Sequence, residues 1–388
     1  MAMAGLYVHI PFCLAKCAYC DFVSFAGLEP LYGAYVEALS LEIALVAPRW
    51  AGFSFDTLFI GGGTPTVLPT ASLEAIIAAC REGLHFAEDA EITVEANPGT
   101  VTPANLSALR KAGVTRLSLG VQSLRDPDLA LLGRLHDRKT ALEAFYWARE
   151  AGFENINLDF IFGLPGQTVS QWQKVLEEAL RLRPEHLSLY ALTLEEGTPL
   201  EARIRRGDLP VPNEEASAAM YELAESLLEG AGYAHYEISN WARRSPKDPP
   251  HGPPTLACRH NLKYWRNEPY LGLGAAAHSY DGAARYANVS DPAAYIARMR
   301  QGQEAVAERE APTLAQKMGE TMMLGLRLIE GISHQDFEVR FGVRLDAVYG
   351  REIGELAQEG LLEVDERGIR LTPRGRLLGN RVFAAFLP

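Results

Sequence analysis

The first half of the chain alternates short apolar runs with longer segments whose apolar residues recur every three or four positions. The short runs predict strands, and the longer spacing predicts amphipathic helices. We expect strands over residues 7–12, 56–60, 91–95, 116–121, 155–160 and 186–190. We expect helices over residues 31–46, 70–82, 126–133, 139–151 and 170–182, with another that begins at Thr102-Pro103.

Regular alternation of strands and helices is typical of a parallel sheet with helices packed outside it. A closed eight-stranded barrel of this kind takes about 250 residues, whereas residues 1–200 hold six strands. The sequence therefore predicts an α/β fold in the form of an incomplete (β/α)6 barrel. In such sheets, ligands bind at the carboxyl ends of the strands.

The pattern changes in residues 201–310, which we expect to form a region that flanks the barrel. A helix is predicted over residues 214–230, and a glycine-rich run follows over 271–277. Between them, residues 244–254 are dense in proline, which favours an extended connector or loop.

Residues 311–388 predict a small C-terminal α+β domain. Helical segments come first, two short strands with a turn follow within 361–371, and a terminal helix comes after Thr372-Pro373. This order of elements is winged-helix-like.

Composition and charge narrow the function classes. The chain has 48% hydrophobic and 22% charged residues, as in soluble globular proteins. The formal net charge of -12 disfavours broad nucleic-acid binding, because neutralising phosphates requires a basic surface. We see no signal-peptide pattern and no apolar run long enough to span a bilayer. Five cysteines, three of them clustered, argue against a disulfide framework and favour a reducing cytoplasm.

The clustered thiols are Cys13, Cys17 and Cys20, on a loop that leaves the first predicted strand. Thiolates are soft ligands that suit zinc or iron–sulfur clusters. A cubane cluster is normally held by four cysteines, so three would leave one iron open to a small ligand. The alternative is a structural zinc site formed by the three cysteines and His9.

Polar or glycine-rich residues follow the other predicted strands at the same edge of the sheet. They are Gly61-Gly62-Gly63-Thr64-Pro65, Glu95, Gln122 with Arg134 on the next helix, and Asp159. Carboxylates accept hydrogen bonds from ligand hydroxyls or amines, and Arg grips carboxylates. Taken singly, each is as well explained by a tight turn or a solvated polar group. Their common position at successive strand ends favours a shared site.

The cysteine spacing resembles that of the radical S-adenosylmethionine (SAM) family. Further matches resemble the branch that holds oxygen-independent coproporphyrinogen III oxidase and the HemW haem chaperones: His9–Cys13, Gly61–Pro65, Glu95–Pro98, Gly120–Ser123, and Asp159 with Gly163–Gly166. The resemblance implies a partial barrel, a [4Fe-4S] cluster on the three cysteines, and SAM on its open iron. It implies SAM-binding positions at Tyr7, Gly62, Gly63, Thr64, Glu95, Gln122, Arg134 and Asp159, with Tyr19 beside the cluster.

Two features separate the chaperones from the oxidases in this branch. The oxidases carry an additional cysteine where this chain has Phe22, and they have a substantial extension before their cluster, whereas Cys13 lies near the start here. The stretch His260-Asn-Leu-Lys-Tyr264-Trp265 also resembles the haem-associated motif of the chaperones. The resemblance therefore implies haem at His260, Tyr264 and Trp265. Cys258, two residues upstream of His260, is a second candidate ligand by its position alone. From chemistry alone, such a histidine is more often structural and such aromatics are more often packing.

Three function hypotheses follow. The resemblance implies a haem chaperone that delivers haem to acceptor proteins, with possible peripheral contact to membrane-bound haem proteins. The alternative is an enzyme that decarboxylates coproporphyrinogen III oxidatively through SAM cleavage. A third is a DNA-binding regulator that uses the winged-helix-like segment, and the acidic net charge counts against it. The oligomeric state is left open.

Overall fold

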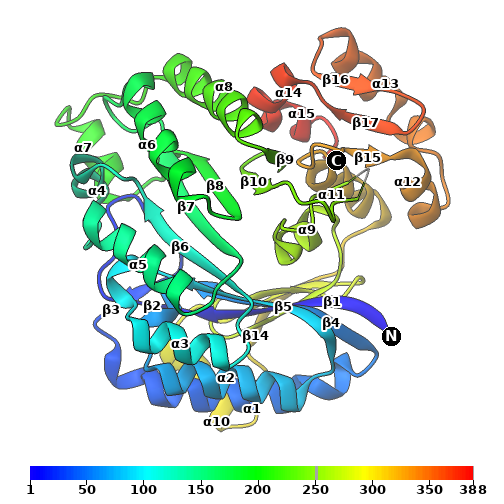
Figure 1. Ribbon diagram of the computed structural model, residues 1–388. Helices are drawn as coiled ribbons and strands as arrows, with labels where there is room; N and C mark the ends of the chain where they lie inside the picture. Colours follow the sequence, from blue (N-terminus) through cyan, green and yellow to red (C-terminus); the bar gives the residue numbers. More distant parts are fainter. Residues whose placement is uncertain (250–251, 388) are drawn as a thin grey trace.

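The computed structural model describes residues 1–249 and 252–387, and within them the dominant feature is a curved twelve-stranded sheet (Figure 1). Its strand order is β14-β13-β12-β11-β1-β4-β5-β6-β7-β8-β10-β9. The central strands are β1 (Ala2–Ile10), β4 (Phe53–Gly62), β5 (Phe86–Ala96), β6 (Arg116–Gln122), β7 (Ile156–Phe162) and β8 (His186–Ala191). These six pair in parallel, in chain order, which confirms the predicted (β/α)6 arrangement.

The strands at the two edges of the sheet were not predicted. On the β8 side lie β10 (Asn240–Arg243) and β9 (Tyr233–Glu237), both antiparallel. On the β1 side lie β11 (Tyr270–Leu273), β12 (His278–Tyr280), β13 (Arg285–Asn288) and β14 (Val306–Glu310). Strand β11 pairs in parallel with β1, and the next three are antiparallel. Residues 201–310 therefore extend the sheet at both edges.

The pleat of β1 sorts its side chains into two sets. Leu6, Val8 and Ile10 are fully buried in the main core. The alternate residues face the inside of the curved sheet, since a Cβ on Gly5 would lie 3.0 Å from the His260 ring. Successive strand residues point to opposite faces, so Tyr7 and His9 also point inward.

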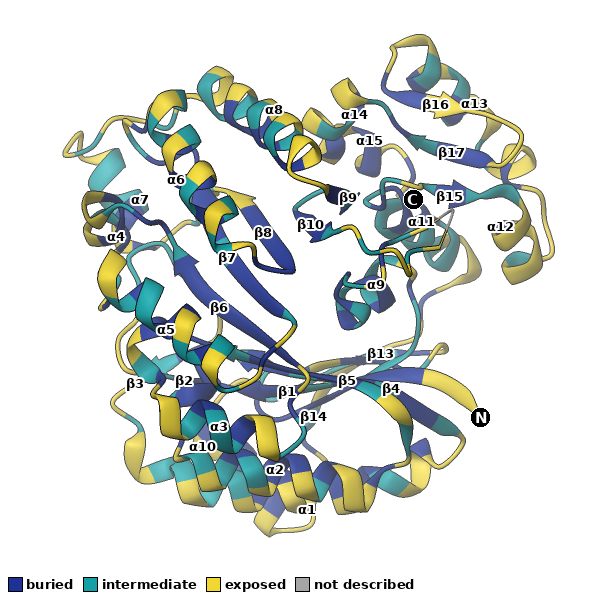
Figure 2. Cartoon of the chain, viewed as in Figure 1, coloured by how far each residue is buried: buried dark blue, intermediate teal, exposed yellow. Residues whose placement is uncertain are grey.

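Helices cover the outer face of the sheet, and their exposed residues face away from it (Figures 1 and 2). They are α1 (Tyr32–Trp50), α2 (Thr70–Gly83), α3 (Pro103–Lys111), α4 (Asp126–Leu132), α5 (Arg138–Glu150), α6 (Val169–Leu182), α8 (Glu214–Gly230) and α10 (Pro292–Arg300). Shorter elements are α7 (Pro199–Arg205), the 3-10 helices η1 (Glu29–Leu31), η2 (Pro65–Val67) and η3 (Pro98–Thr100), and the strand pair β2 (Phe12–Cys13) and β3 (Phe25–Ala26). Helix α9 (Arg259–Trp265) differs because it lies inside the curve of the sheet.

One helical stretch, Glu29–Trp50, is long and apolar enough by length and composition to cross a membrane. This corrects the expectation that no segment of that length exists. Core helices of folded proteins meet the same test, and here Tyr35, Leu39 and Ile43 are buried in the main core. The stretch therefore packs as a core helix of this fold.

The C-terminal segment has its own apolar core, which includes Met322, Phe337 and Phe386. Its elements are α11 (Leu314–Gly325), β15 (Ile332–Ser333), α12 (His334–Phe341), α13 (Leu345–Gln358), β16 (Leu362–Val364), β17 (Gly368–Leu371), α14 (Pro373–Leu377) and α15 (Gly379–Ala384). Strands β16 and β17 are the two strands expected within residues 361–371, and they pair antiparallel.

A buried carboxylate ties the added β-strands to the first helix. Glu42 of α1 accepts hydrogen bonds from the Gly274 backbone N–H, the Asn288 amide and the Tyr295 hydroxyl, each at 2.7 Å. Burial raises the pKa of Glu42 to about 7. The folded protein therefore holds a proton on this group more tightly than the unfolded chain does.

We expect the stability of the protein relative to a Glu42→Gln variant to fall as pH rises from about 5 to about 8. A raised folded-state pKa stabilises the fold at low pH, and this contribution is lost as pH rises through the folded pKa. Thermal unfolding midpoints of both proteins across this range measure the effect, expected as a few degrees. A difference in midpoint that stays constant with pH would show that the folded-state pKa of Glu42 is not raised.

Candidate functional site

Cys13 ends β2, whereas Cys17 and Cys20 lie on the loop that follows it. Backbone hydrogen bonds fix this loop to its surroundings. The Ala18 N–H donates to the Leu132 carbonyl at 3.0 Å, and the Leu200 N–H donates to the Ala18 carbonyl at 2.8 Å. All three cysteines are partly exposed free thiols. They line one cavity of about 400 Å³ at the carboxyl ends of the central strands.

Polar groups from the loops that follow β4 and α4 touch two of the sulfurs. Cys13 Sγ lies 3.5 Å from Thr64 Oγ1, and Arg134 Nη1 donates to Cys17 Sγ at 3.4 Å. The Arg134 guanidinium thus places a positive charge beside the Cys17 sulfur. The remaining cysteines, Cys80 and Cys258, are buried away from this loop. The donor set therefore fits a cubane cluster with three protein-held irons and one open iron.

The zinc alternative does not fit the position of His9. Both of its ring nitrogens are already hydrogen-bonded, Nδ1 to the Tyr7 hydroxyl and Nε2 to the Val23 carbonyl, each at 2.9 Å. Among the described residues, moreover, no three Cys, His, Asp or Glu side chains gather closely enough to hold a single metal ion. In a cubane cluster each cysteine binds a different iron, so the three side chains do not need to converge on one atom.

The glycine loop after β4 forms one wall of the cavity. Gly62 has a φ of 111°, and a Cβ there would lie 2.4 Å from the His9 ring, so only glycine fits. Its N–H donates to Glu95 Oε2 at 3.1 Å, and Thr64 Oγ1 accepts from the Asn97 amide at 2.8 Å. The loop therefore brings backbone groups against the cavity and is held by the end of β5.

Two carboxylates from β5 and β7 face the same cavity. Asp159 accepts hydrogen bonds from Ser118 Oγ at 3.1 Å and Asn157 Nδ2 at 2.8 Å. Burial, followed by the negative charge of Asp159, raises the pKa of Glu95 to about 8. Burial also raises the pKa of Asp159. A cationic ligand would offset the repulsion between these groups, and SAM carries both an ammonium and a sulfonium.

Arg134 and Gln122 complete the wall. Arg134 Nη2 donates to the Gly120 carbonyl at 2.7 Å and to Asn97 Oδ1, while its buried Nε has no hydrogen-bond partner in the described structure. Gln122 has a φ of 66°, a left-handed conformation that is uncommon outside glycine. Both features are typical of residues held in place for a ligand.

Eight of the nine residues expected at the SAM site line this cavity: Tyr19, Gly62, Gly63, Thr64, Glu95, Gln122, Arg134 and Asp159. Tyr7 does not, because it lines an adjoining cavity of about 130 Å³, which shares Glu95, Ser118, Asp159 and Tyr190 with the larger one. Sequence reasoning missed Asn97, Ser118, Gly120 and Tyr190, which also line the larger cavity. Asn97 lies two residues after Glu95, but nothing local in the sequence singles out Ser118 or Tyr190.

The residues expected to bind haem do not form one open site. Helix α9 points His260 into the barrel, where it is 2% exposed. Its Nδ1 is 2.8 Å from Thr57 Oγ1 and its Nε2 is 2.9 Å from the Tyr264 hydroxyl. Burial lowers the pKa of His260 to about 3. Both ring nitrogens are therefore occupied in this conformation, and neither is open to an iron atom.

Of the other two haem candidates, Cys258 lines the smaller cavity together with His260 and Tyr264, whereas Trp265 has other neighbours. The Arg327 guanidinium lies over the Trp265 ring at 4.4 Å from its centroid, on the side of the C-terminal segment. Cys258 is buried, and burial raises the pKa of its thiol to about 12. Of the proline-dense segment expected as a connector, residues 250 and 251 lie outside the described residues.

Comparisons with known proteins show the family of the chain. Residues 7–179 match the Radical SAM superfamily, and residues 313–378 match the HemN C-terminal domain. The protein named Heme chaperone HemW of Bacillus subtilis (strain 168) is 38% identical over 386 residues, covering 99% of both chains. Its namesake in Lactococcus lactis is 37% identical over 384 residues, covering 98% of this chain and 96% of the relative.

A solved structure is similar over nearly the whole chain. The coproporphyrinogen III oxidase HemN of Escherichia coli, described as a radical SAM enzyme, superposes with a TM-score of 0.83 at 27% identity. The match covers 99% of this chain and 90% of the oxidase. Membership of the superfamily implies SAM and a [4Fe-4S] cluster, and the cysteine cavity has the ligands for both. Because the similarity to the chaperones runs through the barrel and the C-terminal segment alike, the chain belongs to the HemW family of radical SAM proteins.

Proposed function

We propose that this protein is a haem chaperone, which carries a SAM-liganded [4Fe-4S] cluster, binds haem and delivers it to acceptor proteins. The observation that supports this most directly is the similarity over 99% of both chains to a protein named Heme chaperone HemW, at 38% identity. The oxidase shares the fold at a lower identity of 27%.

In this proposal the predicted site residues of the larger cavity have defined roles. The thiolates of Cys13, Cys17 and Cys20 hold three irons, and Arg134 balances their negative charge. A [4Fe-4S] cluster supplies a one-electron reductant and an open iron for the amino and carboxylate groups of SAM. Glu95 and Asp159 accept hydrogen bonds from SAM and offset its positive charge. The remaining SAM-facing groups are Gly62, Gly63, Thr64, Gln122 and Tyr19.

The size of the cavities favours a chaperone over the oxidase. A volume of about 400 Å³ lies at the low end for sites that hold one drug-sized ligand, roughly 300–1,000 Å³. SAM would fill most of it, and the deeper cavity of about 130 Å³ is too small for a tetrapyrrole. An oxidase must hold its substrate beside the reacting group and exclude water. Phe22, at the position of the additional oxidase cysteine, is 65% exposed beside this cavity.

Haem binding at His260, Tyr264 and Trp265 remains a prediction. Both nitrogens of His260 are hydrogen-bonded inside the barrel. Ligation of haem iron by this residue therefore requires these hydrogen bonds to break and α9 to move out of the barrel. Cys258 is subject to the same requirement because it is buried at the start of α9.

We further propose that the protein is cytoplasmic. We also propose that it has three regions, residues 1–200, 201–310 and 311–388, the last of which is winged-helix-like. Its separate apolar core supports the last boundary. Acceptors would be haem proteins, with peripheral contact to those in membranes. The net charge of -12 disfavours the DNA-binding alternative.

We expect no conversion of coproporphyrinogen III to protoporphyrinogen IX by reconstituted protein under anaerobic, reducing conditions with SAM. The reason is that Phe22 stands where the oxidases carry their additional cysteine. Chromatography of extracted porphyrins after oxidation measures the product, and the oxidase of E. coli serves as the positive control. Turnover at rates comparable to that control would replace the chaperone with the enzyme.

A further inference from the structure

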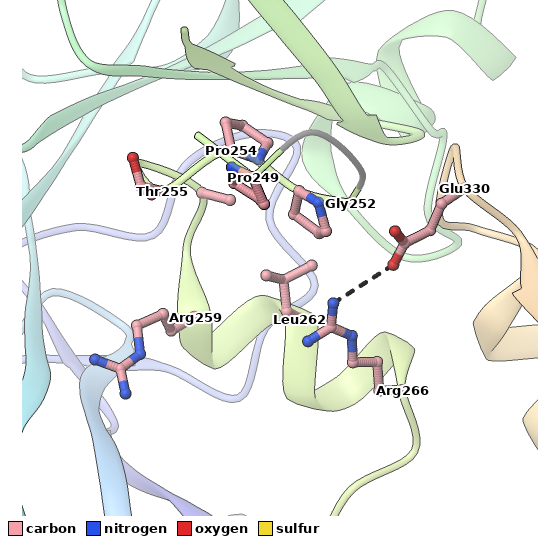
Figure 3. A pocket seen from close by; sticks show the side chains of 10 residues that line it. Pro249, Gly252, Pro254, Thr255, Arg259, Leu262, Arg266 and Glu330 are labelled. Carbon is pink, nitrogen blue, oxygen red and sulfur yellow. Dashed lines mark hydrogen bonds and ion pairs between the residues drawn. The ribbon is translucent and has the colours of Figure 1, made fainter. Parts of the chain in front are cut away.

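Arg134 carries a positive charge that no carboxylate in the described part of the chain neutralises. Arg266, on the outer side of α9, shows the usual arrangement, in which a guanidinium pairs with a carboxylate: it contacts Glu330 at 3.4 Å (Figure 3). Arg134 instead contacts a cysteine sulfur, a backbone carbonyl and an amide oxygen. Its full charge therefore stays beside the cysteine loop.

The amide oxygen that Arg134 contacts belongs to Asn97, on the loop after β5. A guanidinium has only donors, so the amide atom on this side must be the oxygen, and Nδ2 faces the other way. There it donates to Thr64 Oγ1 at 2.8 Å. A hydroxyl that accepts this hydrogen bond keeps its own hydrogen for another acceptor, and Cys13 Sγ lies 3.5 Å away. One amide therefore directs a donor toward the sulfurs of both Cys13 and Cys17.

Asn97 is itself held on two sides. Its carbonyl accepts hydrogen bonds from the Thr100 backbone N–H at 2.9 Å and from Thr100 Oγ1 at 2.8 Å. On the side of β6, a Cβ on Gly120 would lie 2.8 Å from Asn97 Oδ1, so a glycine there makes room for the amide. An acceptor fixed in this way gives the guanidinium of Arg134 one preferred direction.

We propose that Asn97 is a positioning residue that raises the reduction potential of the cluster, an inference that rests on the proposed [4Fe-4S] site. The potential of such a cluster depends on the charge around it and on hydrogen bonds to its sulfurs. Donors and positive charge near the sulfurs favour the reduced form, because it carries one more negative charge. Asn97 exerts this effect through Arg134 at Cys17 and through Thr64 at Cys13.

The neutrality of the amide is the feature that distinguishes this role. An aspartate at position 97 has nearly the same shape and would also accept a hydrogen bond from Arg134, but its charge would neutralise the guanidinium. It has no N–H to donate to Thr64, whose hydroxyl would then turn toward the carboxylate and away from Cys13. Asn97→Asp therefore keeps the position of Arg134 and removes both effects on the sulfurs.

The test measures the midpoint reduction potential of the cluster by electron paramagnetic resonance at set potentials, in anaerobically reconstituted protein with its full iron and sulfide. At the midpoint of the unaltered protein, we expect the ratio of reduced to oxidised cluster to fall about tenfold in Asn97→Asp, which equals about 59 mV for one electron. Asn97→Ala should shift the potential in the same direction. The matched control is Gln358→Glu, which adds the same charge at an exposed position at the end of α13 and should keep the potential.

A further variant tests the route through Arg134. Arg134→Met removes the charge at similar length and should also lower the potential. If Asn97 acts through Arg134, then Asn97→Ala should shift the potential less in the Arg134→Met background than in the unaltered protein, because the two substitutions remove the same contact. Equal shifts in both backgrounds would overturn the inference.

The other outcomes separate this inference from the assignments beneath it. An unchanged potential in Asn97→Asp with a full cluster would overturn the role of Asn97. Loss of the cluster from Asn97→Asp would also overturn it, because the amide would then hold the site together rather than set its potential. Absence of a cluster from the unaltered protein would instead overturn the [4Fe-4S] site. Failure to bind or transfer haem would overturn the chaperone function and leave the role of Asn97 intact.

Discussion

Replacement of Cys13, Cys17 or Cys20 by Ala will abolish the brown [4Fe-4S] chromophore of anaerobically reconstituted protein. Each thiolate is expected to hold one iron, and no other cysteine is in reach because Cys80 and Cys258 are buried elsewhere. A cubane with only two protein ligands is too weakly held to survive isolation. Visible absorption with iron and sulfide analysis measures the loss.

The matched control is Cys80→Ala, which removes a buried thiol of α2 outside the site. It should retain the full chromophore. A full complement of iron and sulfide in any of the three loop variants would contradict the cluster assignment. Stoichiometric zinc in the native protein would do the same and would revive the structural zinc site.

Asp159→Asn and Glu95→Gln should weaken SAM binding while the cluster content stays unchanged. Neither residue donates a thiolate, yet both face the cavity and accept hydrogen bonds there. Loss of a hydrogen bond to a buried polar ligand costs about 1–3 kcal/mol, which corresponds to a rise in Kd of about 5- to 150-fold. Anaerobic isothermal titration of SAM into reconstituted protein gives this value.

The control for the carboxylate variants is Glu143→Gln, which neutralises an exposed carboxylate on α5. It should bind SAM as the unaltered protein does. If both Asp159→Asn and Glu95→Gln kept the original affinity with the cluster present, SAM would have to bind elsewhere.

The central strands were predictable because they are short apolar runs, and their apolar residues are buried in the folded protein. In β1, Leu6, Val8 and Ile10 alternate with inward-facing residues, and the helices between the strands have clear periodicity. Strands β9 to β14 were missed because each has only three to five residues. Such short segments become strands by pairing with a sheet edge that only the folded chain provides.

The larger cavity was largely predictable because strand ends in a parallel sheet meet at one edge. Residues such as Glu95 and Asp159 therefore converge without any local signal beyond their position. The SAM-binding role of Tyr7 stays a prediction, because its ring lines the smaller cavity beside Glu95 and Asp159. The burial of His260 was not predictable, because it depends on α9 packing against strands that are distant in the sequence. Its hydrogen-bond partner Thr57, for example, lies 203 residues earlier in the chain.

The central claim is that haem is cargo for this protein, and an equilibrium titration of haem into the anaerobically reconstituted protein tests it most directly. The account predicts a saturable change in the haem absorption spectrum at one haem per chain, followed by transfer of that haem to an added apo-haem protein. Absence of saturable binding, or bound haem that no acceptor can remove, would contradict it.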